Sequence, residues 1–407
     1  MKITSVEALI LFSERRYTAK HGIDVNRTSP PEQPPGIINR RVLTDRYAGG
    51  RHLCVYPDGG QTVLVRVETD AGLTGWGEAH APYAPTVTQT LILDLFAPLI
   101  LGQNPMASEV LWEKMYGAMR LRGHNTGFTT EAMAGVDIAL WDLRGQMTQQ
   151  PIYALLGGPY RTEIPAYASG LPGLSDTEKQ EKARQYLAEG YTAVKLAIGR
   201  RSLEEDLATV AAVAEVTGNQ AHLLVDAHGA YDLSTAIQVG HELEKMGCYW
   251  LEDPLVPEDH SGYAELSRAL DIMVVAGETE CNRFQFRDRL AVRAVDVILP
   301  DICRAAGITE GQKIAILADA YQTSWAAHVS MGTMVHVAAA LHLGAASPNF
   351  LICEYHPTLT ELGNDLMQTP LEPKNGFLTV PDGPGLGIAF DDEALEKLVV
   401  SRRKVEL

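Results

Sequence analysis

Hydrophobic and polar residues alternate near the start of the chain and give way to helical patterns. Residues 3–11, ITSVEALIL, and residues 61–79, QTVLVRVETDAGLTGWGEA, show the alternation typical of β-strands. Residues 17–52, between them, are polar and rich in Pro and Gly, and helical segments follow around residues 86–120. A polar segment of this length within a compact domain is usually functional or disordered. The pattern predicts a small α+β domain over residues 1–125 with a long loop.

The next part of the chain, residues 126–374, alternates short apolar strands with helical stretches. Eight strands are expected to begin near residues 164, 193, 223, 249, 273, 295, 323 and 350. Repeating βα units with right-handed crossovers predict an α/β fold with a parallel barrel. A doubly wound open sheet is the alternative, but no GxGxxG-type phosphate loop follows the first of these strands. Residues 375–407 form a short third segment.

The composition narrows the class of protein. The chain of 407 residues has a net charge of −17 and is 46% hydrophobic, which argues against a nucleic-acid or anionic-membrane surface. The start of the chain has a strand pattern rather than that of a signal peptide, and no apolar run approaches the ~20 residues of a membrane span. The five scattered cysteines suit reduced thiols. We therefore expect a cytoplasmic protein whose partner is a small molecule.

Acidic residues end three consecutive predicted strands. Asp226, Glu252 and Glu278 are spaced by one βα unit each. Equivalent positions on neighbouring strands meet at the C-terminal rim of a barrel, where barrel enzymes keep their active sites. Three carboxylates that converge there repel one another unless a cation lies between them. Because oxygen-only ligation favours a hard divalent ion, the spacing predicts a Mg2+ site.

The same rim continues with a further set of polar residues. Asp301 ends the sixth predicted strand, His328 lies on the seventh and Glu354 on the eighth. A carboxylate beside an imidazole fixes its tautomer and raises its basicity. Asp301 and His328 are therefore predicted to form a general base. The remaining histidines, His80 and His336 among them, are interpreted as structural or surface residues.

Three further motifs, taken with the strand-end acids, resemble the enolase superfamily and its mandelate-racemase-like subgroup. They are GLTGWGEA at 72–79, GVDIALWDLRGQMTQQPIYALLGG at 135–158 and VPDGPGLGI at 380–388. The resemblance implies a capping domain (1–125), a modified (β/α)7β TIM-type barrel (126–374) and a C-terminal segment (375–407) that returns to the capping domain. It also implies one Mg2+, abstraction of a proton next to a carboxylate, and a dimer-based homo-oligomer, often an octamer.

The resemblance also suggests catalytic roles. Lys195 would stabilise the enediolate anion, and Glu354 matches the family's strand-eight acid beside the substrate carboxylate. Many members of the subgroup carry a second lysine at the position of Ala197, so a two-base racemase or epimerase is disfavoured. His228 resembles the general acid of acid-sugar dehydratases of the galactonate dehydratase type. The expected reaction is therefore loss of water from a sugar acid, giving a 2-keto-3-deoxy acid.

Two other functions remain open. One is an epimerase or cycloisomerase of a sugar acid or its lactone, and the other is a non-catalytic barrel that only binds sugar acids. Substrate contacts are expected from the long loop and its neighbourhood, with His21, Arg46 and Tyr83 as candidates.

Overall fold

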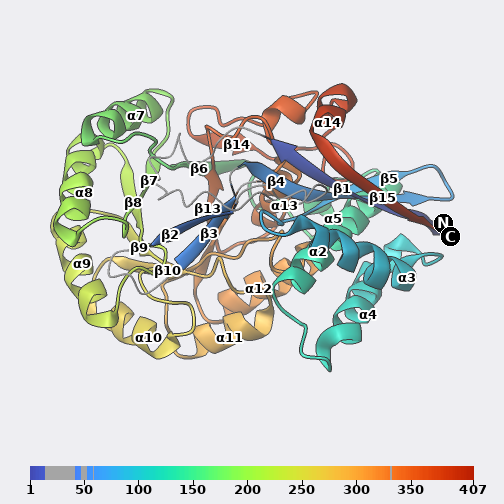
Figure 1. Cartoon of the computed structure of the whole chain (residues 1–407), viewed down its shortest axis with the longest axis horizontal. Helices are drawn as coiled ribbons and strands as arrows, with labels where there is room; N and C mark the ends of the chain where they lie inside the picture. Colours follow the sequence, from blue (N-terminus) through green and yellow to red (C-terminus); the bar gives the residue numbers. More distant parts are fainter. Residues whose placement is uncertain (14–41, 47–52, 58, 331) are drawn as a thin grey trace.

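A parallel barrel forms the larger part of the molecule (Figure 1). The computed structural model describes residues 1–13, 42–46, 53–57, 59–330 and 332–407. Neighbouring strands pair in chain order, and the last pairs in parallel with the first, which closes the barrel. The predicted α/β barrel is confirmed. Its strands are β6 (Glu163–Ser169), β7 (Ala193–Ala197), β8 (His222–Asp226), β9 (Trp250–Glu252), β10 (Met273–Ala276), β11 (Val297–Ile298), β12 (Ser324–Ala327) and β13 (Phe350–Tyr355).

Helices connect the barrel strands and cover the outside of the barrel (Figure 1). Two of them begin with a capping box, in which Ser175 pairs with Glu178 and Ser202 with Glu205. Each serine oxygen accepts a hydrogen bond from a backbone N–H that has no partner within the helix. The capping box therefore fixes the residue at which each helix begins. The helices are α7 (Asp176–Ala188), α8 (Leu203–Thr217), α9 (Leu233–Lys245), α10 (His260–Ala269), α11 (Arg283–Ala291), α12 (Ile308–Ala320) and α13 (Met334–Ala345).

The barrel interior is filled by side chains. Tyr167 and Trp250 meet edge to face with ring centroids 5.6 Å apart, and smaller residues such as Ala193, Leu224 and Val275 complete this cluster. A barrel packed in this way has no channel through its centre. The polar residues at the strand ends therefore face a cavity that is closed below by the packed interior.

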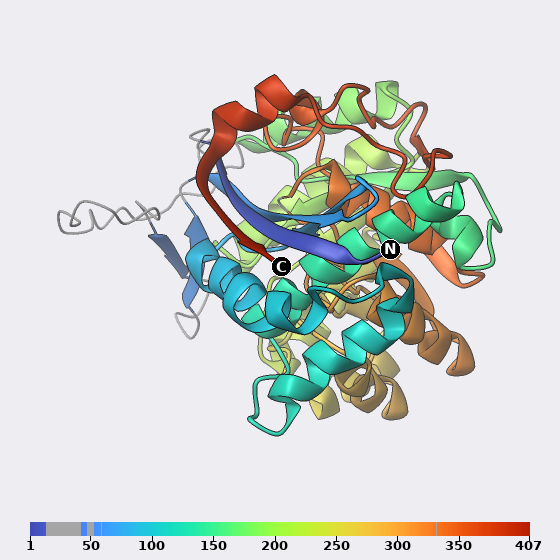
Figure 2. The ribbon, with the colours of Figure 1, turned by 90° about the vertical axis from the view of Figure 1, so that its right-hand side faces the viewer.

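A capping sheet lies beside the barrel (Figure 2). Its antiparallel order is β15 (Val399–Glu406), β1 (Ile3–Ser13), β4 (Gly60–Thr69) and β5 (Thr74–Ala79). The first and last strands of the chain are thus neighbours, and the two termini lie close together (Figures 1 and 2). The helical elements on this side are α2 (Pro85–Thr90), η1 (Leu91–Phe96), α3 (Ala97–Ile100), η2 (Pro105–Ala107), α4 (Ser108–Arg120) and α5 (Phe128–Thr148).

Helix α5 packs directly on β5, and glycines make this possible. A Cβ on Gly77 would lie 1.9 Å from the carbonyl oxygen of Gly135, so this position has no room for a larger residue. Asp142 of α5 accepts the N–H groups of Trp76 (2.9 Å) and Leu386 (2.8 Å). The three motifs at 72–79, 135–158 and 380–388 therefore meet in one place.

The remaining elements are short. β2 (Val42–Arg46), within the segment expected to be a loop, forms a separate antiparallel pair with β3 (Leu53–Pro57), which follows that segment. The others are α6 (Ile152–Leu155), η3 (Asn364–Leu366), β14 (Phe377–Thr379) and α14 (Asp392–Leu398). Among the described residues, no single helix is long and apolar enough to cross a membrane, although the bent pair Pro85–Ile100 with Pro105–Arg120 has sufficient length and apolar composition.

Candidate active site

Polar side chains from the barrel strands gather at the rim around a cavity of about 220 Å³. Asp226 is the last residue of β8 and pairs in register with Glu252, the last residue of β9. Asp301 and His328, which follow β11 and β12, form a parallel bridge. All four are buried. The strand-end spacing thus brings these residues to one rim.

Lys195 on β7 lies among three carboxylates. Its Nζ is 2.7 Å from Glu252 Oε1, 2.9 Å from Glu354 Oε1 and 3.3 Å from Asp226 Oδ2. Burial opposes the charge, but Glu252 and Glu354 outweigh it and raise the pKa of Lys195 well above its usual value. Lys195 is therefore a fixed cation beside the cavity.

Glu354 on β13 is an acceptor in this arrangement. Its Oε1 accepts a hydrogen bond from Ser169 Oγ (2.6 Å), and its Oε2 accepts one from the Val329 N–H (2.9 Å). Burial raises its pKa, but the positive charges of Lys195 and His328 outweigh burial and lower the pKa to about 2. These contacts favour an ionised carboxylate over a hydrogen-bond donor.

The three expected metal ligands, Asp226, Glu252 and Glu278, supply a suitable set of donor atoms. Their oxygens suit Mg2+, and Glu252 Oε2 is buried without a hydrogen-bond partner. Burial and the charge of Asp226 raise the pKa of Glu252 well above its usual value, although Lys195 opposes this shift. Glu278 Oε2 lies 3.0 Å from His328 Nε2.

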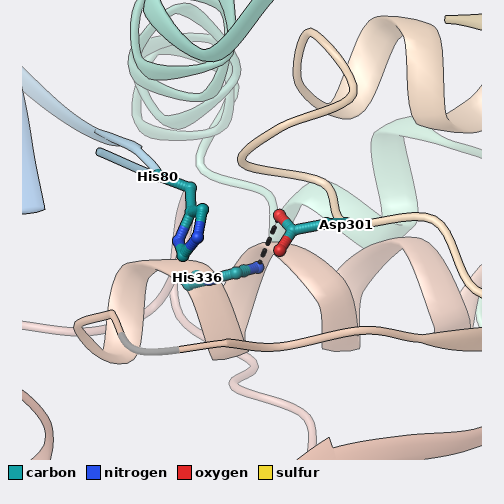
Figure 3. A group of neighbouring side chains, drawn as sticks. All are labelled: His80, Asp301 and His336. Carbon is teal, nitrogen blue, oxygen red and sulfur yellow. Dashed lines mark ion pairs between the residues drawn. The ribbon is translucent and has the colours of Figure 1, made fainter. Parts of the chain in front are cut away.

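A different group of three residues, His80, Asp301 and His336, has its potential metal-ligand atoms close together (Figure 3). Among the described residues, ligand atoms within 4.8 Å of one another occur in His80, Asp301 and His336, and the three strand-end carboxylates form no such group. All three members of the trio are buried. This trio lies behind the base, because Asp301 contacts both His336 and His328.

His328 and Asp301 form the expected pair. His328 Nδ1 lies 2.8 Å from Asp301 Oδ2. Burial lowers the pKa of His328, but the charges of Glu278 and Glu354 outweigh it and raise the pKa well above the usual value. The carboxylate therefore holds one ring nitrogen, and the other, Nε2, faces Glu278 and the cavity.

His228 lies beside the acidic cluster. Its Nδ1 is 3.2 Å from Asp226 Oδ1, and its backbone N–H donates to the same oxygen (3.1 Å). Its φ of 47° places it in the left-handed region, so the chain turns sharply after β8. Burial lowers the pKa of His228, although the charge of Asp226 opposes this shift. His228 and the small residue Ala197 both line the cavity.

The proposed substrate contacts fall into three situations. His21 lies outside the described residues, and of Arg46 only the backbone, in β2, is described. Tyr83 lines the cavity, as do several residues that the sequence patterns did not single out. These additional cavity-lining residues are His80, Lys179, Arg200, Arg201, Arg304 and His356.

Two of these residues carried a sequence signal. His356 follows Glu354 by two positions, the spacing of one strand face, and its Nε2 lies 3.5 Å from Glu354 Oε1. Arg304 follows Asp301 in the same turn, and its Nη1 donates to the Glu278 carbonyl oxygen (2.8 Å). Both positions could have been found from their neighbours in the sequence.

Comparison with known proteins places the chain in a family. The model described as mandelate racemase / muconate lactonizing enzyme, N-terminal domain, matches residues 58–157, and the enolase C-terminal domain-like model matches residues 178–394. D-galactarolactone cycloisomerase of Agrobacterium fabrum is 37% identical over 82% of this chain and 90% of its own. Arabinonate dehydratase of Saccharolobus solfataricus is 33% identical, over 83% and 90%.

A solved structure gives the same placement. A racemase from Streptomyces coelicolor A3(2) with bound magnesium superposes with a TM-score of 0.81 at 25% identity, over 98% of this chain and 100% of that one. Acid-sugar dehydratases and cycloisomerases both occur among the relatives. The chain therefore belongs to the mandelate racemase/muconate lactonizing enzyme group of the enolase superfamily.

Proposed function

We propose that the protein is an enzyme that removes the proton next to the carboxylate of a sugar acid and expels the oxygen substituent on the adjacent carbon. The observation that carries this proposal is the placement of two imidazoles. His328 follows β12 and His228 follows β8, and these strands are four places apart in a closed ring of eight. A base and a proton donor therefore approach the cavity from opposite sides.

The base side of the reaction uses residues already in contact. The contact with Glu278 favours the imidazolium form of His328, so proton abstraction uses its neutral form. In that form Nε2 accepts the proton, while Asp301 holds Nδ1–H and stabilises the imidazolium that forms. The Lys195 ammonium stabilises the negative charge that develops on the substrate carboxylate. Mg2+, held by Asp226, Glu252 and Glu278, would add charge stabilisation at the same carboxylate.

The substrate is anionic in this proposal, and the cavity wall suits an anion. Lys179, Arg200 and Arg201 line the side formed by α7 and the turn between β7 and α8. A basic wall stands out in a chain with a net charge of −17. Such a wall attracts carboxylates, including a second one at the far end of a diacid.

On the proton-donor side, we propose that His228 protonates the departing hydroxide, which makes the enzyme a dehydratase. Hydroxide is a poor leaving group, so its loss needs a proton. Ala197 carries no proton and lies open to the cavity, which argues against a second base on β7. The enol product then converts to a 2-keto-3-deoxy acid.

A cycloisomerase is the second candidate, and one observation favours it. Its reaction uses a leaving group that needs no added proton. The ring carboxylate in the monolactone of a sugar diacid is such a group: the proton next to the free carboxylate is removed, the β-carbon–oxygen bond breaks and the ring opens. The relative that is 37% identical is named a D-galactarolactone cycloisomerase.

One experiment separates these reactions. Wild type and His228→Asn are incubated with Mg2+ in D2O and a panel of sugar acids and their lactones, and keto acid formation and proton exchange are followed by NMR. A dehydratase forms keto acid from open-chain acids and loses about 100-fold or more of this activity in the variant, while exchange survives if deprotonation is reversible. A cycloisomerase opens lactones with little effect of the variant. Absence of both exchange and keto acid throughout the panel would contradict either enzyme.

A further inference from the structure

Asp301 is shared between two histidines. Its Oδ2 faces His328 Nδ1 at 2.8 Å, and its Oδ1 lies 3.1 Å from His336 Nε2 (Figure 3). Oδ1 also accepts the backbone N–H of Arg304 (3.0 Å). Asp301 and His336 are fully buried. The carboxylate is therefore held from the side opposite the base, by a residue that does not line the cavity.

The capping sheet holds His336 in turn. Glu78 of β5 accepts the backbone N–H of His336 at 3.2 Å and both the N–H and the hydroxyl of Thr333, at the start of α13. A Cβ on Gly332 would lie 2.8 Å from Glu78 Oε1 and 3.1 Å from His336 Nδ1, so the chain approaches closely here. A carboxylate of the capping sheet thus fixes the first turn of a barrel helix.

We propose that His336, anchored by Glu78, is a positioning residue for the base: it holds Asp301 so that the proton stays on His328 Nδ1 and Nε2 faces the substrate carbon. This inference rests on the proposed function of His328. A carboxylate with one imidazole partner is free to rotate about its Cβ–Cγ bond, whereas two imidazoles and a backbone N–H define its plane. Geometry of this kind matters because a displacement of about 1 Å in a catalytic group costs on the order of 100-fold in rate.

Metal binding is the competing explanation for this trio, and the charges around it disfavour it. The Arg304 guanidinium is close enough to reinforce the effect of burial in lowering the pKa of His80. A divalent ion between His80, Asp301 and His336 would sit near this cation. It would also share Asp301 with the His328 ring. A continuous series of contacts from Glu78 of β5 through His336 and Asp301 to the base agrees better with these charges.

The test compares two buried histidines of the same helix. His342 lies on α13, is also fully buried, and places Nε2 3.1 Å from the Leu386 carbonyl oxygen, away from the base. We expect His336→Leu to lower kcat by about 100-fold with KM changed less than about threefold. We expect His336→Gln, which keeps a donor near Asp301, to recover most of this loss. The matched variants His342→Leu and His342→Gln should leave kcat within about twofold, even where they lower the melting temperature equally.

Equal losses of kcat in His336→Leu and His342→Leu would overturn the proposal, as would failure of His336→Gln to recover activity. One equivalent of zinc in purified wild type, absent from His336→Leu, would show a metal site instead. A second readout does not depend on turnover. In 15N-histidine-labelled protein, the Nδ1–H signal of His328 should persist in wild type and His342→Leu and be lost in His336→Leu. An unchanged signal would refute the positioning role, while a wild type without activity on any sugar acid would refute only the proposed function.

Discussion

The two halves of the barrel rim differ in how completely they are prepared for chemistry. After β11 and β12, Asp301 and His328 already have a catalytic geometry, held by hydrogen bonds. At the ends of β8 and β9 and after β10, the carboxyl groups of Asp226, Glu252 and Glu278 lie beside Lys195 and His328. The first half is preorganised by contacts between protein groups, whereas the second is a set of carboxyl groups whose oxygens suit a divalent cation.

The largest effect is expected on the preorganised half. His328→Gln removes the base, so both α-proton exchange and product formation should fall by about 1,000-fold or more. The measurement is NMR-detected exchange in D2O with the best substrate of the panel. His241→Gln, at an exposed histidine on α9, serves as the control. Residual exchange near the wild-type rate would mean that another residue is the base.

Removal of divalent cations tests the other half. Treatment with EDTA should abolish turnover, and Mg2+ should restore it, because the proposed ion stabilises the charge that develops on the substrate carboxylate. Glu252→Gln should weaken Mg2+ binding measured by calorimetry. Full activity in EDTA, or unchanged Mg2+ affinity in Glu252→Gln, would show that these carboxylates do not hold the ion. Asp271→Asn, an exposed acid before β10, is a control of similar charge change.

Lys195 joins the two halves, and its loss should have an intermediate effect. Lys195→Met removes the ammonium that stabilises developing charge, so kcat should fall by about 100-fold. The methionine side chain cannot replace the ammonium in this role, because its thioether carries no charge. The same variant leaves Glu252 and Glu354 without their cation, so metal-free protein should also melt at a lower temperature. Wild-type kcat in this variant would exclude the enediolate-stabilising role.

Asp137 is a buried acid outside the rim. Its replacement is expected to change the pH dependence of stability and to have the smallest effect on activity. Burial raises the pKa of Asp137 on α5 to about 7, although Thr309 donates two hydrogen bonds to it. Since the folded pKa exceeds the unfolded value of about 3.9, this group stabilises the fold below about pH 4, and the contribution is lost as the pH rises through about 7.

Asp137→Asn should therefore flatten the pH dependence of the free energy of unfolding between about pH 4 and 7, by up to about 4 kcal/mol, and leave kcat nearly unchanged. Denaturant unfolding at a series of pH values is the measurement. A slope identical to that of the wild type would show that Asp137 does not titrate in this range.

Sequence patterns predicted the barrel and the rim because both depend on spacing. One βα unit between Asp226, Glu252 and Glu278 is enough to place them on adjacent strands. Spacing does not determine side-chain direction, so the turn of Glu278 toward His328 had no sequence signal. His336 was also missed, because its contact with Asp301 joins a helix start to a strand end that are distant in the chain.

The capping sheet was only partly readable for a similar reason. Alternation predicted strands in residues 3–11 and 61–79, and the structure has β1, β4 and β5 there. The strand β2 lies in the polar segment rich in Pro and Gly and β3 directly follows it, and both strands are only five residues long, too short for a clear alternation. Pairing between β1 and β15 spans nearly the whole sequence, a separation that no local pattern reports.

The pairing of β1 with β15 affects the order in which the capping sheet forms during synthesis. The ribosome releases β1 before the barrel strands and β15 after them, so the outer edge of β1 stays without its neighbour until the barrel has been translated. A nascent chain in this state presents open backbone groups that invite association with other chains. Insertion of a bulky group directly after Leu407, which donates its N–H to the Thr4 carbonyl oxygen, would therefore disturb the pairing of β15 with β1 more than an equal addition on a barrel helix.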